Sequence, residues 1–531
     1  MFWLDRVFGQ IETSLAEKIR NKERLLIRDE KTASGRVHVG SMRALGLHAA
    51  ISERLEEAKI PHEFRYEIND MDPMDGLPSY LDQEKYAKEM GKPLFAVPAP
   101  DGTAKNFAEY FAEDYIAAIH EAGFAPLLYR ASELYFSGQM NGAIRHALEK
   151  AATVRKIYEE VSGAKRPGDW LPVTVICENC GKMGTTRAFD FDGETVAYAC
   201  EPRLVAWAEG CEHSGRISPF DGNAKLHWKV DWPAKWFVLG VDIEGGGKDH
   251  FTKGGSRDVG KRITTEVFDY PEPFGVANEF FLVGGKRMSS SRGQGSSARD
   301  VVTLVPPRIF RLALFGKDIN QQINFDPKGD TIPLLFDQYD RLAAKYWEGV
   351  RDDDSRLFEY IHAVRERAEL PEAKRFLPRF SQVAFAVQMP HLNLRQEIEK
   401  MKGAPLTEKD IEEGDLRAEY ARRWLEKAAD EEYKFTLAED GVPESAKNLS
   451  EAQKKALGEV REALRSNQDL TGSDFHALLH EIRQASPLSA QEFFGALYLS
   501  FLGKPSGPKA GWFLGILPRE FVLHRLDEVS R

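Results

Sequence analysis

Cysteine is scarce in this sequence: the chain of 531 residues has four, and all of them fall between positions 177 and 211. Thiols so few and so close together argue against a disulfide framework and favour a local metal site. The sequence also lacks any uninterrupted apolar run long enough to span a bilayer. Its first residues become charged too early for a secretory signal. We therefore expect a cytoplasmic protein with no membrane partner.

The chain has fewer basic than acidic side chains. The chain has 72 lysines and arginines against 83 aspartates and glutamates, which gives a net charge of −11. Because nonspecific nucleic acid binding depends on neutralising phosphates, this charge argues against general binding of RNA or DNA, although a local basic face remains compatible with it. With 42% hydrophobic and 29% charged residues, the chain is an ordinary globular protein that is too long for one core. It should divide into several domains.

One stretch near the start of the chain is the most informative. An apolar run at 25–27 precedes Thr32-Ala33-Ser34-Gly35-Arg36-Val37-His38-Val39-Gly40-Ser41, and apolar residues then recur at helical spacing up to position 59. Residues 64–68 alternate as a second strand, so the segment predicts a β-α-β unit that opens a parallel sheet. The first amides of its helix, with glycines before them, favour a phosphate or carboxylate, and a histidine at position 38 can donate a hydrogen bond there.

A second segment lies about 250 positions downstream, in Lys286-Arg287-Met288-Ser289-Ser290-Ser291-Arg292-Gly293. Three cations and three hydroxyl groups with a single bulky apolar residue are suited to wrapping a polyphosphate. Each segment alone has a simpler interpretation: the first as a surface loop with a satisfied histidine, the second as a solvated linker. It is the pair that favours a nucleotide site.

Together these segments resemble the HIGH signature (here 38–41) and the KMSKS signature (here 287–291) of class I aminoacyl-tRNA synthetases. The runs Val230-Asp231-Trp232-Pro233-Ala234-Lys235-Trp236 and Gly247-Lys248-Asp249-His250, with the ending at 502–511, are similar to the class I lysyl-tRNA synthetase family. The resemblance extends over nearly the whole chain.

The resemblance implies a lysine-tRNA ligase. Such an enzyme uses ATP and Mg²⁺ to convert lysine to lysyl-adenylate and then transfers the lysyl group to the 3′-terminal adenosine of tRNA(Lys). Two alternatives remain open: another class I synthetase, for glutamate or cysteine, and a catalytically inactive, zinc-containing tRNA-binding paralogue. Ser41, in place of the usual last histidine of the first signature, keeps the second alternative open.

The resemblance also implies roles for individual residues. The catalytic positions would be His38, Gly40, Ser41, Arg287, Ser290 and Arg292. The ATP-binding positions would be Ala33, Ser34, Gly35, His38, Gly40, Asp249, His250, Lys286, Arg287, Met288, Ser289, Ser290 and Ser291. Lysine would meet Thr32, Trp232 and His250, whereas Trp236 is expected to pack in the core. The second segment departs from the usual pattern, with Arg287 and Ser290 at the two lysine positions.

Two acidic residues follow the second predicted strand, Asp70 and Asp72. Ligands of parallel sheets bind beyond the carboxyl ends of the strands, so these carboxylates are candidates for a cationic substrate. The alternative is ordinary turn chemistry.

The cysteines form two pairs of unequal spacing. Cys177-Glu178-Asn179-Cys180-Gly181 is typical of a zinc-knuckle turn. The second pair is less compact, because residues 201–210 separate Cys200 from Cys211, with His213 just beyond. We expect four of these five residues to bind Zn²⁺, with Cys211 or His213 as the fourth ligand. The alternative is a ribbon that folds without metal.

The predicted fold class is α/β: a Rossmann-like parallel-sheet catalytic domain with insertions, followed by an all-α region. We expect the first half of the catalytic domain at 1–80, a helical insertion at 81–170, a zinc-ribbon-like insertion at 171–225 and the second half at 226–305. Residues 306–531 are rich in segments with helical spacing and poor in strand patterns. By resemblance, they would form an α-helix cage that binds the anticodon.

Overall fold

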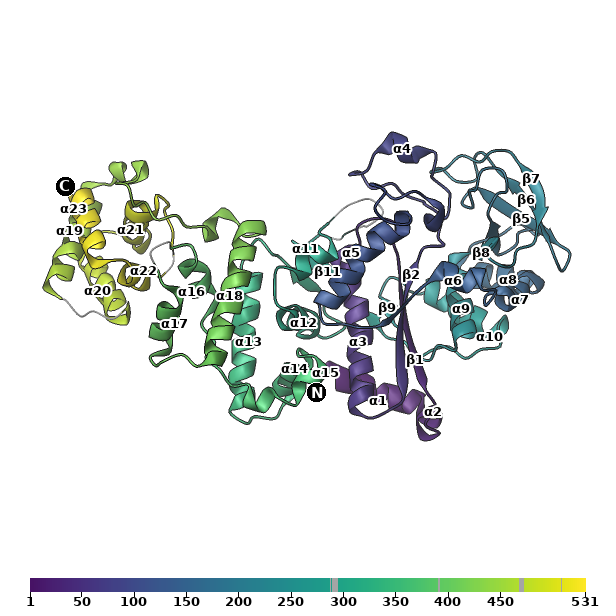
Figure 1. Cartoon of the computed structure of the whole chain (residues 1–531), viewed down its shortest axis with the longest axis horizontal. Helices are drawn as coiled ribbons and strands as arrows, with labels where there is room; N and C mark the ends of the chain where they lie inside the picture. Colours follow the sequence, from purple (N-terminus) through teal and green to yellow (C-terminus); the bar gives the residue numbers. More distant parts are fainter. Residues whose placement is uncertain (287, 289–294, 390–391, 468–471, 508) are drawn as a thin grey trace. The chain divides into compact units, whose positions relative to one another are not determined.

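The computed structural model describes residues 1–531 except 287, 289–294, 390–391, 468–471 and 508. The chain forms two compact units (Figure 1). The first contains Met1–Asp326 and Arg341–Glu372, and the second contains Pro327–Asp340 and Ala373–Arg531. No helix among the described residues is both long and apolar enough to cross a membrane.

A parallel sheet forms the centre of the first unit. Strands β1 (Leu25–Thr32), β2 (His62–Asn69) and β3 (Leu127–Arg130) lie side by side in that order and all pair in parallel. Beyond β1, single parallel bridges join Ile27 to Ile243 and Ile243 to Phe274. The short strands β9 (Gly246–Gly247) and β10 (Ala277–Asn278) continue this side of the sheet, again in parallel. This arrangement confirms the predicted α/β class.

Helices connect the parallel strands. A 3₁₀ turn at Val39–Ser41 leads into α3 (Met42–Glu57), which connects β1 to β2 and packs against both. Helix α5 (Phe107–Glu121) precedes β3, and α1 (Trp3–Ser14) packs on α3. Three further short elements precede the sheet or lie between β2 and α5: α2 (Ala16–Arg20), α4 (Gln83–Ala87) and a 3₁₀ turn at Leu94–Ala96. The β-α-β prediction is therefore confirmed, and α3 begins at Met42, directly after the first signature.

Five helices of this unit surround a core that is shared with the ribbon: α6 (Ala131–Phe136), α7 (Asn141–Glu149), α8 (Ala151–Ser162), α9 (Trp228–Leu239) and α10 (Ser256–Glu266). The apolar spacing within residues 140–161 predicts a single helix. The structure breaks that helix at Lys150, where the backbone leaves the helical region (φ −97°, ψ 24°).

The cysteine-containing insertion is a small antiparallel ribbon. Strands β5 (Thr186–Phe191), β6 (Val196–Cys200) and β7 (Ser214–Ile217) form a meander. At its base, β4 (Val173–Val175) pairs with β8 (Ala224–Leu226), so the insertion leaves and re-enters the unit side by side.

The first unit ends beyond residue 306, where the sequence suggested that the helical region begins. Strand β11 (Phe281–Val283) pairs with β12 (Ile323–Phe325), and that pairing holds the segment up to Asp326 in the unit. The remaining elements of this unit are helices: α11 (Ala298–Val302), α12 (Pro307–Phe315), α14 (Asp353–Tyr360) and α15 (Val364–Arg367), followed by a 3₁₀ turn at Leu370–Glu372.

The described part of the second unit contains helices and no strand. Helix α13 (Thr331–Trp347) begins in this unit and ends in the first. The others are α16 (Phe380–Ala386), α17 (Leu394–Lys402), α18 (Glu408–Lys427), α19 (Glu451–Ser466), α20 (Gly472–Ala485), α21 (Ala490–Leu502), α22 (Ala510–Ile516) and α23 (Arg519–Ser530). Leu457, Phe493 and Phe513 are fully buried in its core.

Candidate active site

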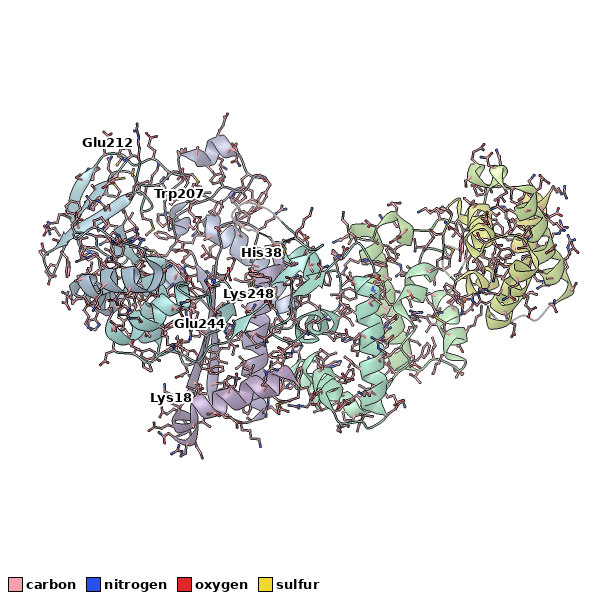
Figure 2. All side chains as sticks on the ribbon, turned by 180° about the vertical axis from the view of Figure 1, so that it is seen from behind. Lys18, His38, Trp207, Glu212, Glu244 and Lys248 are labelled. Carbon is pink, nitrogen blue, oxygen red and sulfur yellow. The ribbon has the colours of Figure 1, made fainter. Side chains whose placement is uncertain are left out.

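A cavity of about 440 Å³ opens where strands β1, β9 and β10 end. This is the edge of a parallel sheet at which ligands bind. Its wall comes from segments that are far apart in sequence, including those of His38 and Glu244, which Figure 2 labels. The lining residues that matter below are Asp29, Glu30, Lys31, Thr32, His38, Gly40, Ser41, Asp72, Trp228, Trp232, Glu244, Asp249, His250 and Met288.

The two signature segments meet at this cavity. Val39 donates its backbone N–H to the carbonyl of Ser296 (3.2 Å), and Ala298 donates to the carbonyl of Val37 (2.8 Å). His38 and Ser297 form the antiparallel bridge between these bonds. Met288 lies so close to Gly40 that a Cβ added to the glycine would sit 3.3 Å from the Met288 Cε. The first signature is thus joined by backbone to residues 296–298, which follow the second signature, and Met288 lines the same cavity as His38.

The structure places the predicted catalytic and ATP-binding residues unevenly. His38, Gly40, Ser41, Asp249, His250 and Met288 all line the cavity. Ala33, Ser34, Gly35 and Lys286 are not among the described residues that line it. The predictions for Arg287, Ser289, Ser290, Ser291 and Arg292 fall outside the described residues. Ser41 stands at the start of α3, but its side chain makes no capping hydrogen bond there.

His38 is neutral at physiological pH. Burial, together with the positive charge of Lys31, lowers the pKa of His38 to about 3. The imidazole can therefore donate one N–H to a ligand but carries no charge of its own. Gly40 makes room for it, because a Cβ at that position would lie 2.8 Å from the His38 Nδ1.

An aromatic wall forms one side of the cavity. The rings of Trp228 and Trp232 stack with centroids 5.4 Å apart and planes 9° from parallel. The His250 ring lies next to both indoles, with its centroid 6.0 Å from that of Trp228 and 5.7 Å from that of Trp232. Trp236 is fully buried behind them. Such a wall can pack an aliphatic stem and attract a cation at its tip.

Glu244 holds this wall in place. Its carboxylate accepts the indole N–H of Trp232 (2.9 Å) and that of Trp236 (2.7 Å). It also accepts a hydrogen bond from Arg28 (2.7 Å), whose guanidinium in turn contacts Glu67 at 2.9 Å and Glu30. Five of these residues, all except Glu30, are at most 3% exposed. Glu30, Trp232 and Glu244 are the members of the group that line the cavity.

The charge network continues below the cavity through Lys235 and Lys225. Lys235 contacts Glu67 at 2.5 Å and Asp231 at 2.8 Å. Lys225 contacts Asp231 at 2.9 Å and Asp72 at 3.0 Å. The whole network has three cations against five carboxylates, namely Arg28, Lys225 and Lys235 against Glu30, Glu67, Asp72, Asp231 and Glu244. With all five carboxylates ionised, the floor of the cavity is thus two charges short of balance and favours a cationic ligand.

The two acidic residues after β2 have different surroundings. Asp70 accepts hydrogen bonds from the backbone N–H (2.8 Å) and the hydroxyl (2.6 Å) of Ser132, at the start of α6. Its carboxylate is thereby used in the fold. Asp72 lines the cavity, and its Oδ2 accepts the hydroxyl of Thr32 (2.8 Å). Of the two, Asp72 is the one that can face a ligand.

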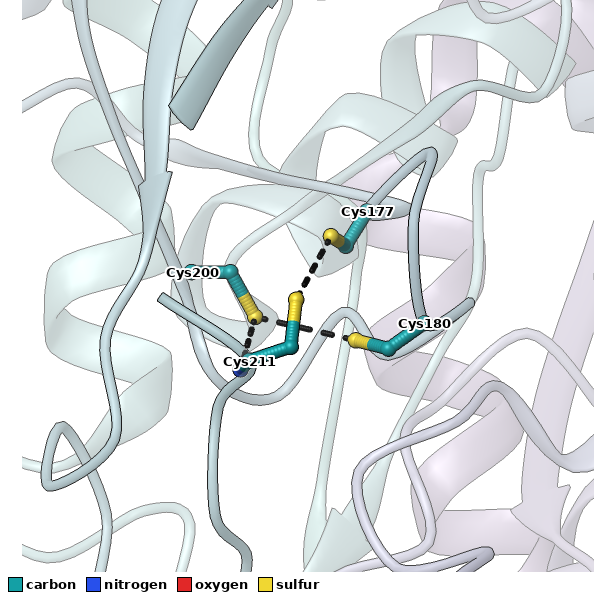
Figure 3. Close-up of side chains that lie close together, drawn as sticks. All are labelled: Cys177, Cys180, Cys200 and Cys211. Atoms are coloured by element: carbon teal, nitrogen blue, oxygen red, sulfur yellow. Dashed lines mark hydrogen bonds between the residues drawn. The ribbon is translucent and has the colours of Figure 1, made fainter. Parts of the chain in front are cut away.

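The four cysteines converge in the ribbon (Figure 3). Their Sγ atoms all lie within 4.8 Å of one another, with Cys177 3.6 Å from Cys211 and Cys180 3.7 Å from Cys200. Four thiols at this spacing fit a tetrahedral zinc site. His213 is not in this group; its ring leans on Tyr198, with centroids 5.9 Å apart.

The insert at 201–210 does not separate the second cysteine pair in space. A Cβ at Gly210 would lie 2.4 Å from the carbonyl oxygen of Glu201, so the two ends of the insert are in contact. The backbone N–H of Cys211 therefore reaches the Cys200 sulfur at 3.3 Å.

Sequence reasoning missed Glu30, Lys31, Trp228 and Glu244. A signal for the first two was present. A strand in the middle of a parallel sheet is normally a continuous apolar run, yet β1 contains Arg28-Asp29-Glu30-Lys31. Charges in such a strand need either partners or a ligand.

Comparison with known proteins shows which family the chain resembles. The family model described as "tRNA synthetases class I (K)" matches residues 1–366. The lysine–tRNA ligase of Methanosarcina barkeri is 33% identical over 97% of this chain and 97% of its own length. Lysine–tRNA ligase 1 of Methanosarcina acetivorans is 35% identical, with the same coverage of both chains. A solved glutamate tRNA ligase from Elizabethkingia meningosepticum covers 96% of this chain and 99% of its own, with TM-score 0.42 and 13% identity.

A parallel sheet whose edge cavity is shared by both signature segments defines a class I aminoacyl-tRNA synthetase. Within that class, the chain belongs to the class I (K) tRNA synthetase family. The resemblance drawn from the two signatures is confirmed. Enzymes of this kind use ATP with Mg²⁺.

Proposed function

We propose that this enzyme is a lysine-tRNA ligase. It uses ATP to convert lysine to lysyl-adenylate, and it transfers the lysyl group to the 3′-terminal adenosine of tRNA(Lys) in the cytoplasm. The observation that carries the proposal is the meeting of the segments around His38 and Met288 at one cavity. The relatives at 33% and 35% identity are themselves named lysine–tRNA ligases.

ATP is proposed to bind at the end of β1, with its phosphates toward His38, Gly40 and Ser41. The carboxylate of lysine attacks the α-phosphorus, and pyrophosphate leaves on the opposite side. This reaction needs positioned donors and charge stabilisation more than covalent help from the protein. Mg²⁺ enters with the ATP. The predicted loop residues Arg287, Ser290 and Arg292 remain candidates for contacts to the leaving pyrophosphate.

Lysine is proposed to bind between the aromatic wall and the acidic floor. Trp232 packs its aliphatic stem, with Thr32 and His250 beside the amino acid. The excess negative charge at Glu30 and Asp72 attracts the ε-ammonium. A glutamate side chain would meet carboxylates there, and a cysteine side chain would leave the acidic floor without a cation. The wall and floor therefore favour lysine over both.

Zn²⁺ is proposed as a structural ion held by Cys177, Cys180, Cys200 and Cys211. Four protein ligands leave no open position, which is the pattern of a structural rather than a catalytic zinc. The helical second unit is proposed to bind the anticodon of tRNA(Lys), a role that rests on family resemblance.

The proposal is tested by amino-acid-dependent exchange of pyrophosphate into ATP, measured with lysine, glutamate and cysteine, each with and without tRNA. We expect exchange with lysine only. Exchange with glutamate or cysteine would assign another specificity. If none of the three supports exchange in either condition, the inactive paralogue is the correct interpretation.

A pH dependence follows from Glu30. Burial raises the pKa of Glu30 to about 7, against the opposing effect of Lys235 and Arg28. Only the ionised carboxylate attracts the ε-ammonium, and the ionised fraction rises about tenfold between pH 6 and pH 8 for a group with that pKa. We therefore expect the KM for lysine to fall by up to that factor over this range.

Measuring KM for lysine against pH in Glu30→Gln provides the comparison. That variant should bind lysine more weakly at pH 8 and show a flat profile. Glu67 does not contribute to the change, because Lys235 and Arg28 outweigh its burial and lower the pKa of Glu67 to about 2. A wild-type profile that stays flat from pH 6 to pH 8 would contradict the assignment.

A further inference from the structure

Lys31 has an unusual position in the cavity. It is the one lysine or arginine among the described residues that line the cavity, where five carboxylates also lie. These are Asp29, Glu30, Asp72, Glu244 and Asp249. A triphosphate is strongly anionic and needs cations close to it. Within the described wall, Lys31 is the side chain that can supply one.

The side chains of β1 alternate between the two faces of the sheet, so neighbouring residues of this strand meet different surroundings. Successive side chains of a strand point to opposite faces of the sheet. Asp29 faces helix α3, where its Oδ2 lies 3.2 Å from the Nδ1 of His48. Lys31, two residues on, shares that face, whereas Arg28 and Glu30 face the tryptophans and Lys235. Lys31 therefore lies on the side of α3 and the 3₁₀ turn, and Glu30 on the side of the aromatic wall.

The ammonium of Lys31 makes no hydrogen bond and no ion pair within 4 Å to any residue that the structure describes. Its acidic neighbours are engaged elsewhere: Asp29 with His48 and the Glu30 backbone (2.8 Å), Glu30 with Arg28 and Lys235. The other lysines of the site differ sharply, since Lys225 contacts two carboxylates and Lys235 contacts three. A half-buried cation without a partner costs free energy that a bound anion recovers.

Two electrostatic effects agree with this geometry. Burial lowers the pKa of Lys31 in the absence of ligand. The charge of Lys31 also contributes to the low pKa of His38, which places the two groups within electrostatic reach of each other. Both effects would be relieved by a phosphate between them.

We propose that Lys31 binds the phosphates of ATP and stabilises the pyrophosphate as it leaves. The proposal rests on the function proposed above. A carboxylate oxygen of lysine forms a bond to the α-phosphorus, the bond from that phosphorus to the oxygen bridging to the β-phosphate breaks, and its electron pair leaves with pyrophosphate. Lys31 lines the same cavity as His38 and can meet that developing charge there, as a cation carried by the sheet.

The test is pyrophosphate exchange in Lys31→Met and Lys31→Arg, with ATP and lysine varied separately. Losing one charge-assisted contact to phosphate should lower kcat/KM for ATP by about 10- to 100-fold. The KM for lysine should change little, and Lys31→Arg should recover part of the loss. The matched control is Lys156→Met, which removes the same charge from a side chain that is 68% exposed on α8.

Thermal melting distinguishes phosphate binding by Lys31 from a structural role of this residue. Because the ammonium has no partner among the residues that the structure describes, Lys31→Met should melt at or above the wild-type temperature. A lower melting temperature with equal loss for both substrates would assign Lys31 to the fold and overturn the proposal. So would an unchanged kcat/KM for ATP in a wild-type background that shows lysine-dependent exchange. If the wild type itself shows no such exchange, it is the proposed function that fails.

Discussion

Replacing His38 by alanine is expected to reduce lysine-dependent pyrophosphate exchange by about 100- to 1,000-fold, the usual cost of removing one positioned donor from an active site. His38 is fixed by the backbone on both sides, since Val37 and Val39 are hydrogen-bonded to the segment that follows the second signature. The ring packs over Gly40 and lines the cavity. Its N–H is thus held in position before ATP binds.

The protonation state of His38 sharpens this prediction. With a pKa of about 3, the ring should remain neutral from pH 5 to pH 8, so the dependence on His38 should be equal across that range. His38→Asn keeps a donor and should recover part of the activity, whereas His524→Ala, on an exposed surface, should have no effect. Exchange that is undiminished in His38→Ala would remove the histidine from the phosphate site.

The sheet could be predicted because its pattern is local. The apolar run at the start of β1, the alternation of side chains in β2 and the helical spacing between the two strands all lie within 45 residues. The strands on the other side of β1 were missed because they pair through single bridges, at Ile243 and Phe274, and have little pattern of their own. The helix break at Lys150 was missed because apolar spacing continues through it.

The residues that line the cavity could be predicted where they belong to a sequence motif, and the others could not. His38, Thr32, Trp232 and His250 were identified, and all line one cavity. Lys31 and Glu30 were missed because a charge in a strand has no role until its face and partners are known. Lys225 and Lys235 are buried lysines too, yet each is paired, and only the structure distinguishes them from Lys31.

The ribbon shows why spacing can mislead. Residues 201–210 separate Cys200 from Cys211 and left His213 open as a ligand. The insert closes on itself at Glu201 and Gly210, so its length does not affect the distance between the sulfurs. Spacing along the chain predicts a ligand set only where the loop between the ligands is short.

The second large effect is expected from the ribbon. Cys200→Ser should abolish zinc binding and unfold the ribbon. The binding free energy of zinc in small thiolate modules is on the order of 10 kcal/mol at neutral pH and is there the energy of folding. Cys177 and Cys200 are each 1% exposed, and the ribbon's core is small, with Ala188, Val196 and Tyr198 beside them. Metal content by atomic emission should fall from one zinc per chain to none, and a low-temperature melting transition should appear.

His213→Ala is the matched control, because it removes the fifth predicted ligand without touching a thiol. It should keep one zinc and the wild-type melting curve.

The effect of Cys200→Ser should reach the active site as well. Strand β8, which closes the ribbon, carries Lys225 to its contacts with Asp72 and Asp231 below the cavity. A zinc-free protein should therefore bind lysine more weakly, since Asp72 loses one of the partners that position it. Zinc loss in His213→Ala equal to that in Cys200→Ser, or full zinc retention in the latter, would contradict the four-cysteine site.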